Sequence, residues 1–182
     1  MTKEFAHWLK DPVTDADWSR GPRDGVVLVE YADYQCPSCQ AAFGIVETVL
    51  DRIGSRVRFV VRHFPVVSIH PYAERAALSA EAAGRQGKFW EMHRRLFEAR
   101  GALSDENLAL YAQDLGLDVE RFKQDMEDES LAAKVKRQKW QGLRSGVNGT
   151  PTLYIGQLRY DGRVNETDLR TAIEAEMNRD RS

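Results

Sequence analysis

The stretch that decides the fold is VVLVEYADYQCPSCQ, residues 26–40. Its first eight residues favour a β-strand, and apolar side chains stand at both alternating faces, which is typical of a strand covered on both sides. The two cysteines of the chain, Cys36 and Cys39, follow at once, with Pro37 and Ser38 between them. A buried strand therefore leads directly into a closely spaced cysteine pair.

The residues after the cysteines predict a helix and then a second strand. From Pro37 to about Gly54, apolar residues recur at spacings of three and four, and a glycine is a common helix stop. VRFVVRHF (57–64) is a second run of strand formers, which Pro65 ends. A strand, a helix and a strand with short joints predict a βαβ unit, in which the two strands are parallel.

The middle of the chain, residues 71–145, has helical patterns throughout, and helix starts are indicated at Pro71, Ser104, Asp118 and Ser130. Beyond it, GVNGTPTLYIGQLRYDG predicts a hairpin with strands at 152–155 and 158–160 around Gly156-Gln157. The last motif, ETDLRTAIEAEMNR, predicts a closing helix. The order is therefore βαβ, a helical block, then ββα.

This order predicts an α/β, thioredoxin-like fold with an all-helical insertion, because a hairpin and a helix complete the sheet that the βαβ unit begins. We predict a single domain over residues 1–182, with the thioredoxin core at 26–65 and 146–182. The helical insertion is predicted at 66–145, and residues 1–25, which are polar and contain prolines and glycines, are predicted to form an extended arm.

Composition excludes several classes of protein. The chain has 182 residues, 30% of them charged, and a net charge of −2 with no basic block, so nucleic-acid binding is not expected. No apolar run approaches the roughly 20 residues that span a bilayer, so no membrane insertion is expected. The first residues lack the apolar core of a signal peptide, which favours a cytoplasmic location over a mature periplasmic form whose signal was removed.

The spacing of the cysteines predicts redox chemistry. With Cys36 at the N-cap of the helix, Pro37 falls at the first helical position, which proline favours, and Cys39 falls one turn later. Cβ atoms at that spacing lie about 5–6 Å apart, close enough for a disulfide to form with little backbone movement. The helix N-terminus stabilises a thiolate, so Cys36 should have a lowered pKa, be the more exposed of the two and attack as nucleophile. Cys39 is then the resolving thiol.

Two other uses of a cysteine pair are less well supported. A zinc site needs about four ligands, the pair supplies two, and no metal-like pairing is seen among His7, His63, His70 and His93. We therefore predict no metal. A structural disulfide between these positions would close a very short loop and add little stability.

Four motifs carry a resemblance to a known family: LVEYADYQCPSC, RHFP, IHPYAERAALSAEAAGRQGKFWEMHRRLF and VNGTPTLYIG. Together they resemble the DsbA-like thioredoxin-fold family, in a branch of bacterial proteins also found fused to membrane transporters. The resemblance runs from about residue 20 to the end of the chain. It implies thiol–disulfide exchange with protein or small thiol and disulfide substrates, an unidentified redox partner and no bound cofactor.

The resemblance also implies roles for individual residues. It makes Cys36 and Cys39 the redox pair and Pro151 a cis-proline beside them, with Thr150 on the substrate-binding edge. It also places an acidic residue beneath the cysteines, which here is Glu30. Glu30 is then a buried carboxyl with a raised pKa that takes the proton of Cys39. The alternative is an edge strand that leaves Glu30 in water.

Pro37 and Ser38 tune the redox pair, and Ser38 departs from DsbA, which has a histidine there. A serine hydroxyl can donate a hydrogen bond to the thiolate but brings no positive charge, so we expect a less oxidising pair. The prediction is a thiol–disulfide oxidoreductase. The alternative is a redox-responsive binding module or chaperone of the same fold, in which the cysteine pair is a switch without turnover.

Overall fold

A computed structural model describes residues 7–179 of the chain. The first six and last three residues, which belong to the predicted arm and to the end of the predicted domain, lie outside the described residues. Every element that the sequence patterns predict over residues 26–179 is present, and the thioredoxin-like arrangement of βαβ, helical block and ββα is confirmed.

A five-stranded mixed sheet forms the centre of the molecule, in the order β1-β3-β2-β4-β5. The predicted βαβ unit is confirmed, because β2 and β3 run parallel; the other neighbouring pairs are antiparallel. β2 lies in the middle of the sheet, with a hydrogen-bonded neighbour on each side. The strands are β1 (Trp18–Arg20), β2 (Val26–Ala32), β3 (Val57–His63), β4 (Thr152–Ile155) and β5 (Leu158–Tyr160).

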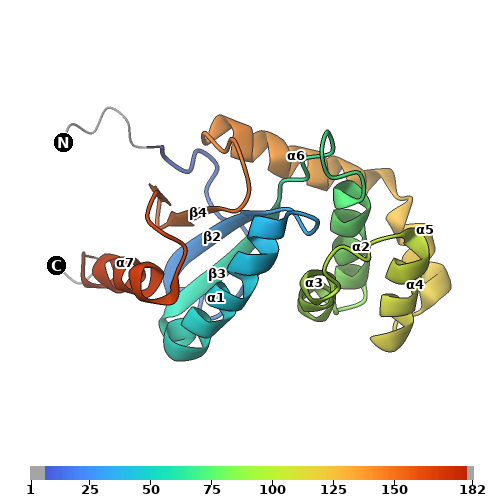
Figure 1. Cartoon of the computed structure of the whole chain (residues 1–182), viewed down its shortest axis with the longest axis horizontal. Coiled ribbons are helices and arrows are strands. Elements are labelled where there is room, and N and C mark those ends of the chain that lie inside the picture. The colour runs from blue at the N-terminus through green and yellow to red at the C-terminus, as the bar shows by residue number, and fades with distance from the viewer. Residues whose placement is uncertain (1–6, 180–182) are drawn as a thin grey trace.

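Helices cover both faces of this sheet (Figure 1). On one face lie α1 (Pro37–Ile53), which ends in a short 3₁₀ turn (Gly54–Arg56), and α7 (Glu166–Arg179). On the other face α6 (Glu129–Arg144) packs against β3, over a smaller apolar cluster that includes Tyr31 and Tyr154. The cysteines lie on the α1 face, at the end of β2.

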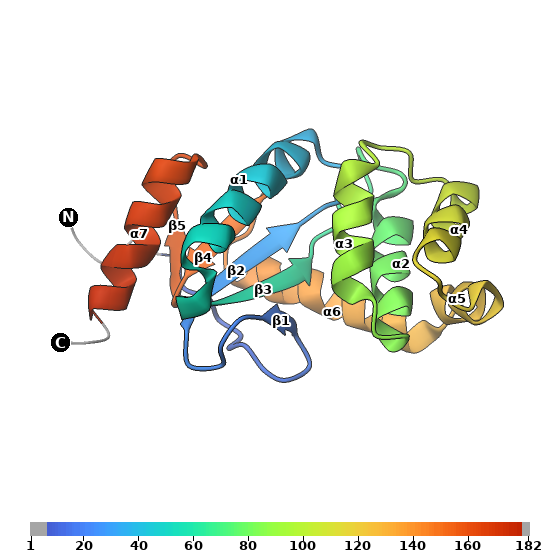
Figure 2. The same ribbon diagram turned by 90° about the horizontal axis from the view of Figure 1, so that it is seen from below.

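The insertion is helical, as predicted, and lies beyond the ends to which β2 and β3 point (Figure 2). It contains α2 (Ala73–Arg85), α3 (Phe89–Glu98), α4 (Asp105–Asp114) and α5 (Val119–Met126), followed by α6. Ser104 and Asp118 cap their helices as predicted. The prediction for the last of these helices was wrong by two residues, because Asp128 rather than Ser130 is the cap and accepts from the Ser130 N–H.

The arm predicted at residues 1–25 contains a strand that the sequence did not reveal. β1 pairs antiparallel with β3, and Trp18 stacks on Phe89 with ring centroids 4.6 Å apart. The Trp18 indole also donates a hydrogen bond to Glu81, at 2.9 Å. A strand of three residues is too short to show alternation in the sequence, so the prediction of an extended arm did not include its pairing with β3.

A buried arginine ties the rest of the arm to the sheet. Arg62, in β3, is 1% exposed and forms an ion pair with Asp17 at 2.9 Å. The other groups of its guanidinium donate to the Tyr31 hydroxyl and to the carbonyls of Asp11 and Pro12. Burying an isolated guanidinium would cost free energy. These bonds satisfy the N–H donors of Arg62 at a position inside β3.

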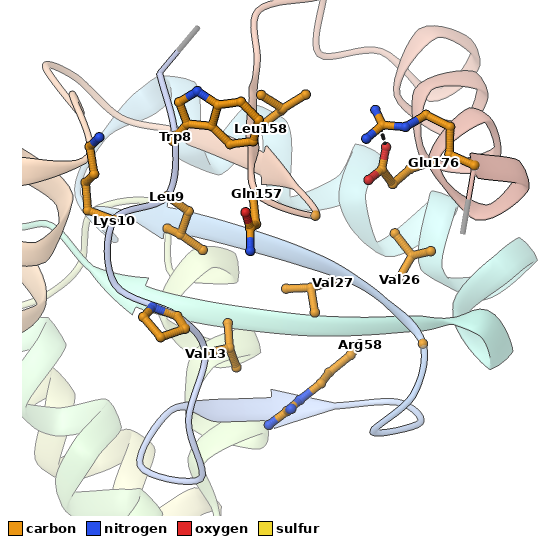
Figure 3. Close-up of a pocket in the computed structure, with 14 residues that line it drawn as sticks. Trp8, Leu9, Lys10, Val13, Val26, Val27, Arg58, Gln157, Leu158 and Glu176 are labelled. Carbon is orange, nitrogen blue, oxygen red and sulfur yellow. Dashed lines mark ion pairs between the residues drawn. The ribbon is translucent and has the colours of Figure 1, made fainter. Parts of the chain in front are cut away.

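A groove lies between the arm and the start of β2 (Figure 3). It has a volume of about 730 Å³, and its lining includes Val27, Arg58 and Gln157. Trp8 forms an antiparallel bridge with Leu158 at its rim. Because the groove is at the first residues of β2 and the cysteines follow the last, the two lie at opposite ends of that strand.

Candidate active site

The first cysteine stands at the N-cap of α1, as predicted. Cys36 has extended backbone angles, φ −69° and ψ 122°, and Pro37 occupies the first helical position. Cys39 lies in the first turn of the helix, and the two cysteines are 4.0 Å apart and unbonded, as a dithiol. The pair therefore has the spacing that a CxxC segment at a helix start imposes.

Both cysteines are buried, and Cys36 is the more exposed of the two, as predicted. Cys36 is 8% exposed and Cys39 is fully buried. Cys36 is covered by the loop before β4, a contact between residues far apart in the chain. Of the two sulfur-bearing residues, only Cys36 therefore has any contact with solvent.

The surroundings of Cys36 lower the pKa of its thiol to about 5. A hydrogen bond from the Cys39 thiol is the largest cause; burial opposes it, and the Thr150 side chain and the backbone of Cys39 and Ser38 add to it. The predicted direction of the shift agrees with this geometry. Ser38 itself is exposed and contributes its backbone, where we expected its hydroxyl.

The same interactions act in reverse on the second cysteine. The hydrogen bond to Cys36, the burial of the thiol and the nearby Glu30 carboxylate all raise the pKa of Cys39 above its ordinary value. Cys39 therefore stays protonated while Cys36 is a thiolate. A group that accepts its proton is needed before Cys39 can act as a nucleophile.

The loop before β4 brings Thr150 and Pro151 to the cysteines. The Thr150–Pro151 peptide bond is cis, the geometry that the resemblance implies. The Cys36 thiol lies 3.3 Å from the Thr150 carbonyl oxygen and donates a hydrogen bond to it. Both residues are partly exposed beside Cys36, which leaves this backbone accessible next to the more reactive sulfur.

Glu30 lies in the central strand, so the edge-strand alternative was wrong. It pairs in register with Val61 of β3 and Leu153 of β4, and it is 2% exposed. Its Oε1 atom has no hydrogen-bond partner among the described residues. Burial raises the pKa of Glu30 to about 7; the negative charge of Glu47 adds to this and the positive charge of Arg20 opposes it.

Asp33 is a site residue that the sequence analysis missed. It is 1% exposed and accepts hydrogen bonds from the backbone N–H groups of Gln35 and Val66, and it contacts His70 Nδ1 at 2.8 Å. Asp33 thereby ties the turn that precedes Cys36 to the loop before α2. An aspartate directly after a strand and two residues before a turn N–H is the signal that could have found it.

Behind the cysteines lies a buried polar cluster that links the core to the insertion. Tyr34 bonds to His93 Nδ1 at 2.9 Å, and His63 Nε2 bonds to Glu81 at 3.0 Å. Lys134 completes the cluster with a 2.7 Å bond to Glu81. Although burial opposes it, His63 and Lys134 hold the pKa of Glu81 down to about 2.

No group of three or more His, Cys, Asp or Glu side chains within residues 7–179 is arranged to hold a metal ion. The groups gathered at the site are the two sulfurs, the Glu30 carboxyl and the backbone around Thr150.

A family model described as thioredoxin matches residues 18–175, most of the chain. The chain belongs to this thioredoxin family. The match begins at β1 and extends into α7, so it includes the helical insertion together with the core.

Solved structures agree with this thioredoxin assignment. A thioredoxin-like oxidoreductase from Silicibacter pomeroyi DSS-3 is 28% identical, with a TM-score of 0.82, and the match covers 91% of this chain and 94% of that one. BdbD from Bacillus subtilis, in its oxidised form, has the same fold at 22% identity, with a TM-score of 0.81 over 92% of this chain and 96% of that one. The predicted resemblance to DsbA-like proteins is confirmed for the fold.

The curated relatives are named as antiporters rather than as oxidoreductases. The Na(+)/H(+) antiporter NhaA 1 of Salinispora arenicola is 40% identical over 160 residues, which are 87% of this chain and 24% of the relative. The chain thus spans about a quarter of the length of the curated relatives that it matches first. Among residues 7–179, no helix is both long enough and apolar enough to cross a bilayer.

Proposed function

We propose that this protein is a thiol–disulfide oxidoreductase in which Cys36 is the nucleophile and Cys39 the resolving thiol. The observation that carries the proposal is the contrast between the two sulfurs. The pKa of Cys36 is lowered to about 5, whereas that of Cys39, 4.0 Å away, is raised. A chain with two equivalent structural thiols would have no such contrast.

The steps follow from this contrast. The Cys36 thiolate attacks one sulfur of a substrate disulfide, so that a Cys36–substrate bond forms and the substrate S–S bond breaks; the departing thiolate takes a proton from water. Cys39 then passes its proton to the Glu30 carboxylate and attacks Cys36. The Cys36–Cys39 bond forms, the second substrate sulfur departs as a thiolate, and two electrons have moved from protein to substrate. The reverse sequence oxidises a dithiol.

Protein disulfides, and small disulfides of similar reach, are the proposed substrates. Thr150 and Pro151 lie partly exposed against Cys36, where an extended substrate backbone would pass. In this proposal the backbone of Thr150 binds the substrate chain beside its disulfide. No cofactor is needed, because the two thiols carry both electrons.

A turnover assay tests the proposal. The protein should catalyse reduction of insulin or of a small aromatic disulfide by dithiothreitol, and Cys36→Ser should abolish catalysis. Cys39→Ser should instead accumulate a mixed disulfide with the substrate, which is visible by mass spectrometry and released by added thiol. If the unmodified protein exchanges with no dithiol or disulfide, the oxidoreductase proposal is wrong.

The alternative is a redox-responsive module without turnover. The observation that favours it comes from the relatives that are named as antiporters. The chain matches only about a quarter of the length of each of them. In such a module Cys36 and Cys39 would open and close once and alter the binding of a partner. A single stoichiometric oxidation without multiple turnovers in the insulin assay would favour this alternative.

The direction of electron flow depends on the reduction potential of the pair. Ser38 brings no charge to the Cys36 thiolate, which supports a less oxidising pair than one with a histidine in its place. In the expected cytoplasmic location the pair would rest as a dithiol and act as a reductase. Equilibration with glutathione buffers of known potential, with alkylation to count free thiols, measures this directly.

A further inference from the structure

Glu30 is a buried carboxyl group with an oxygen that accepts no hydrogen bond from the described residues. It lies in the central strand at 2% exposure, and its Oε1 atom has no hydrogen-bond partner among residues 7–179. A carboxylate can be stabilised by hydrogen bonds or by nearby charge. Because that oxygen lacks the first, the charges around Glu30 have more influence on its proton affinity than they would on a hydrogen-bonded carboxylate.

An ion cluster of three residues lies on the same side of the sheet. Glu47, on α1 about two turns after Cys39, accepts a hydrogen bond from Arg20 of β1 and another from Arg94 of α3, the latter at 3.0 Å. We call these three residues the rim cluster. The Glu47 side chain is only 15% exposed, so the pair with Arg20 is partly shielded from solvent.

The strand register places Arg20 on the face that carries Glu30. Arg20 lies opposite Phe59, which in turn lies opposite Leu28, and directly opposed residues share a face of a sheet. Glu30, two residues after Leu28, is therefore on that face as well. The Arg20 guanidinium is fixed there, 5.2 Å above the Phe59 ring and 4.9 Å from the Trp90 ring.

Glu47 and Arg20 of the rim cluster are the charged side chains that act on Glu30, and the other groups packed on this face are largely uncharged. Of the titratable side chains, burial keeps the pKa of Tyr34 well above and that of His93 well below the ordinary value, so both are neutral. α7 and β4 present apolar side chains to this face. The remaining titratable neighbours are Cys39, which stays protonated until it is activated, and the buried His63–Glu81 pair behind Tyr34.

We propose that the Arg20–Glu47 ion pair of the rim cluster, which Arg94 helps to hold through Glu47, adjusts the proton affinity that burial gives to Glu30. The negative charge of Glu47 disfavours ionisation of Glu30 and the positive charge of Arg20 favours it, so the balance between them shifts the pH at which Glu30 can accept a proton. This inference rests on the proposed function for its consequence, because the proton concerned is that of Cys39. Arg20 and Glu47 are positioning residues that act through Glu30 and touch no substrate.

The test is a titration of the Glu30 carboxyl carbon by NMR, in protein labelled with ¹³C-glutamate and carrying Cys36→Ser and Cys39→Ser. Glu30→Gln identifies the signal. Glu47→Gln should lower the midpoint and Arg20→Gln should raise it, each by roughly half a pH unit or more, since one charge of the pair is left without its counterion. Arg20→Lys keeps the charge and should leave the midpoint within a few tenths of the parent value.

A matched control is Glu166→Gln, which removes a different ion pair of α1, to Arg52, with both side chains substantially exposed. It should leave the Glu30 midpoint where it is. A merely structural role for the rim cluster would lower the melting temperature of both variants and move the midpoint in neither, or in the same direction in both. Either of those outcomes overturns the inference.

The readout needs no enzyme turnover, so the two proposals can fail separately. If exchange occurs and Glu30→Gln slows it, but the titration is the same in Arg20→Gln and Glu47→Gln, the inference about the rim cluster is wrong and the proposed function stands. If the midpoints move in opposite directions but the unmodified protein exchanges no disulfide, the rim cluster does control Glu30 and the proposed function is wrong.

Discussion

The ionised Glu30 carboxylate should destabilise the folded protein at high pH, and Glu30→Gln should remove that effect. Burial raises the pKa of Glu30 from 4.5 to about 7. Between these values the folded state holds a proton that the unfolded state has released, so stability falls as the pH rises. Below the lower value both states are protonated and Glu30 contributes no pH dependence.

The size of this effect follows from the pKa difference. A difference of 2.5 (7 − 4.5) corresponds to about 3 kcal/mol at 1.36 kcal/mol for each unit of pKa. In a chain of this length, that is roughly 6–12 °C in melting temperature. The cost of burying the uncharged amide of Glu30→Gln is the same at every pH, so it cancels when the slopes are compared.

The assay is urea unfolding at several pH values from 4.5 to 8.5. Cys36→Ser and Cys39→Ser in both proteins remove the titration of the thiols. The free energy of unfolding should fall by about 3 kcal/mol more over this range with Glu30 present than with Glu30→Gln. Glu120→Gln, which changes an exposed carboxylate, serves as the control. Parallel curves for the parent and Glu30→Gln would refute the raised pKa of Glu30.

Three further predictions concern the thiols and the packing. Iodoacetamide should alkylate Cys36 with a midpoint near pH 5, and Cys39→Ala should raise that midpoint, because it removes the hydrogen bond that lowers the pKa most; an unmoved midpoint contradicts this. Arg62→Met should cost about 3–5 kcal/mol in urea unfolding, since it strands a buried carboxylate, and a loss below about 1 kcal/mol would argue against the ion pair. Gly142→Ala should lower the free energy of unfolding by about 1–3 kcal/mol, because the new methyl would come within 2.8 Å of the Phe64 ring. Gly44→Ala, with open space around it, should instead raise the free energy of unfolding by up to about 1 kcal/mol, and equal shifts in melting temperature for the two variants would contradict this difference.

The redox pair could be found from the sequence because its geometry is local. A strand pattern, a proline at the first helical position and two cysteines three residues apart fix where Cys36 and Cys39 stand on α1. Helix caps such as Ser104 and Asp118 were found for the same reason, since a cap bonds to the N–H three residues later. Features of both kinds depend only on residues within one or two helical turns of each other in the sequence.

Contacts between distant residues were decided by the tertiary structure alone. The bond from Cys36 to the Thr150 carbonyl joins residues 114 apart, and no local pattern marks it. Whether Glu30 lay at an edge or in the centre of the sheet depended on the order of the strands, which places β2 between β3 and β4. β1 was missed because its three residues form a strand by pairing with β3, and their own sequence has no strand pattern.

The charges around Glu30 also come from residues that lie far apart in the sequence. Local sequence patterns were enough to predict that a CxxC pair begins a helix after a buried strand that contains an acidic residue. Only the folded chain brings Arg20, Glu47 and Arg94, from three different elements, to one rim beside that residue. The physical reason is that a pKa depends on burial and on charges close in space, and proximity in space follows from strand order and helix packing rather than from sequence spacing.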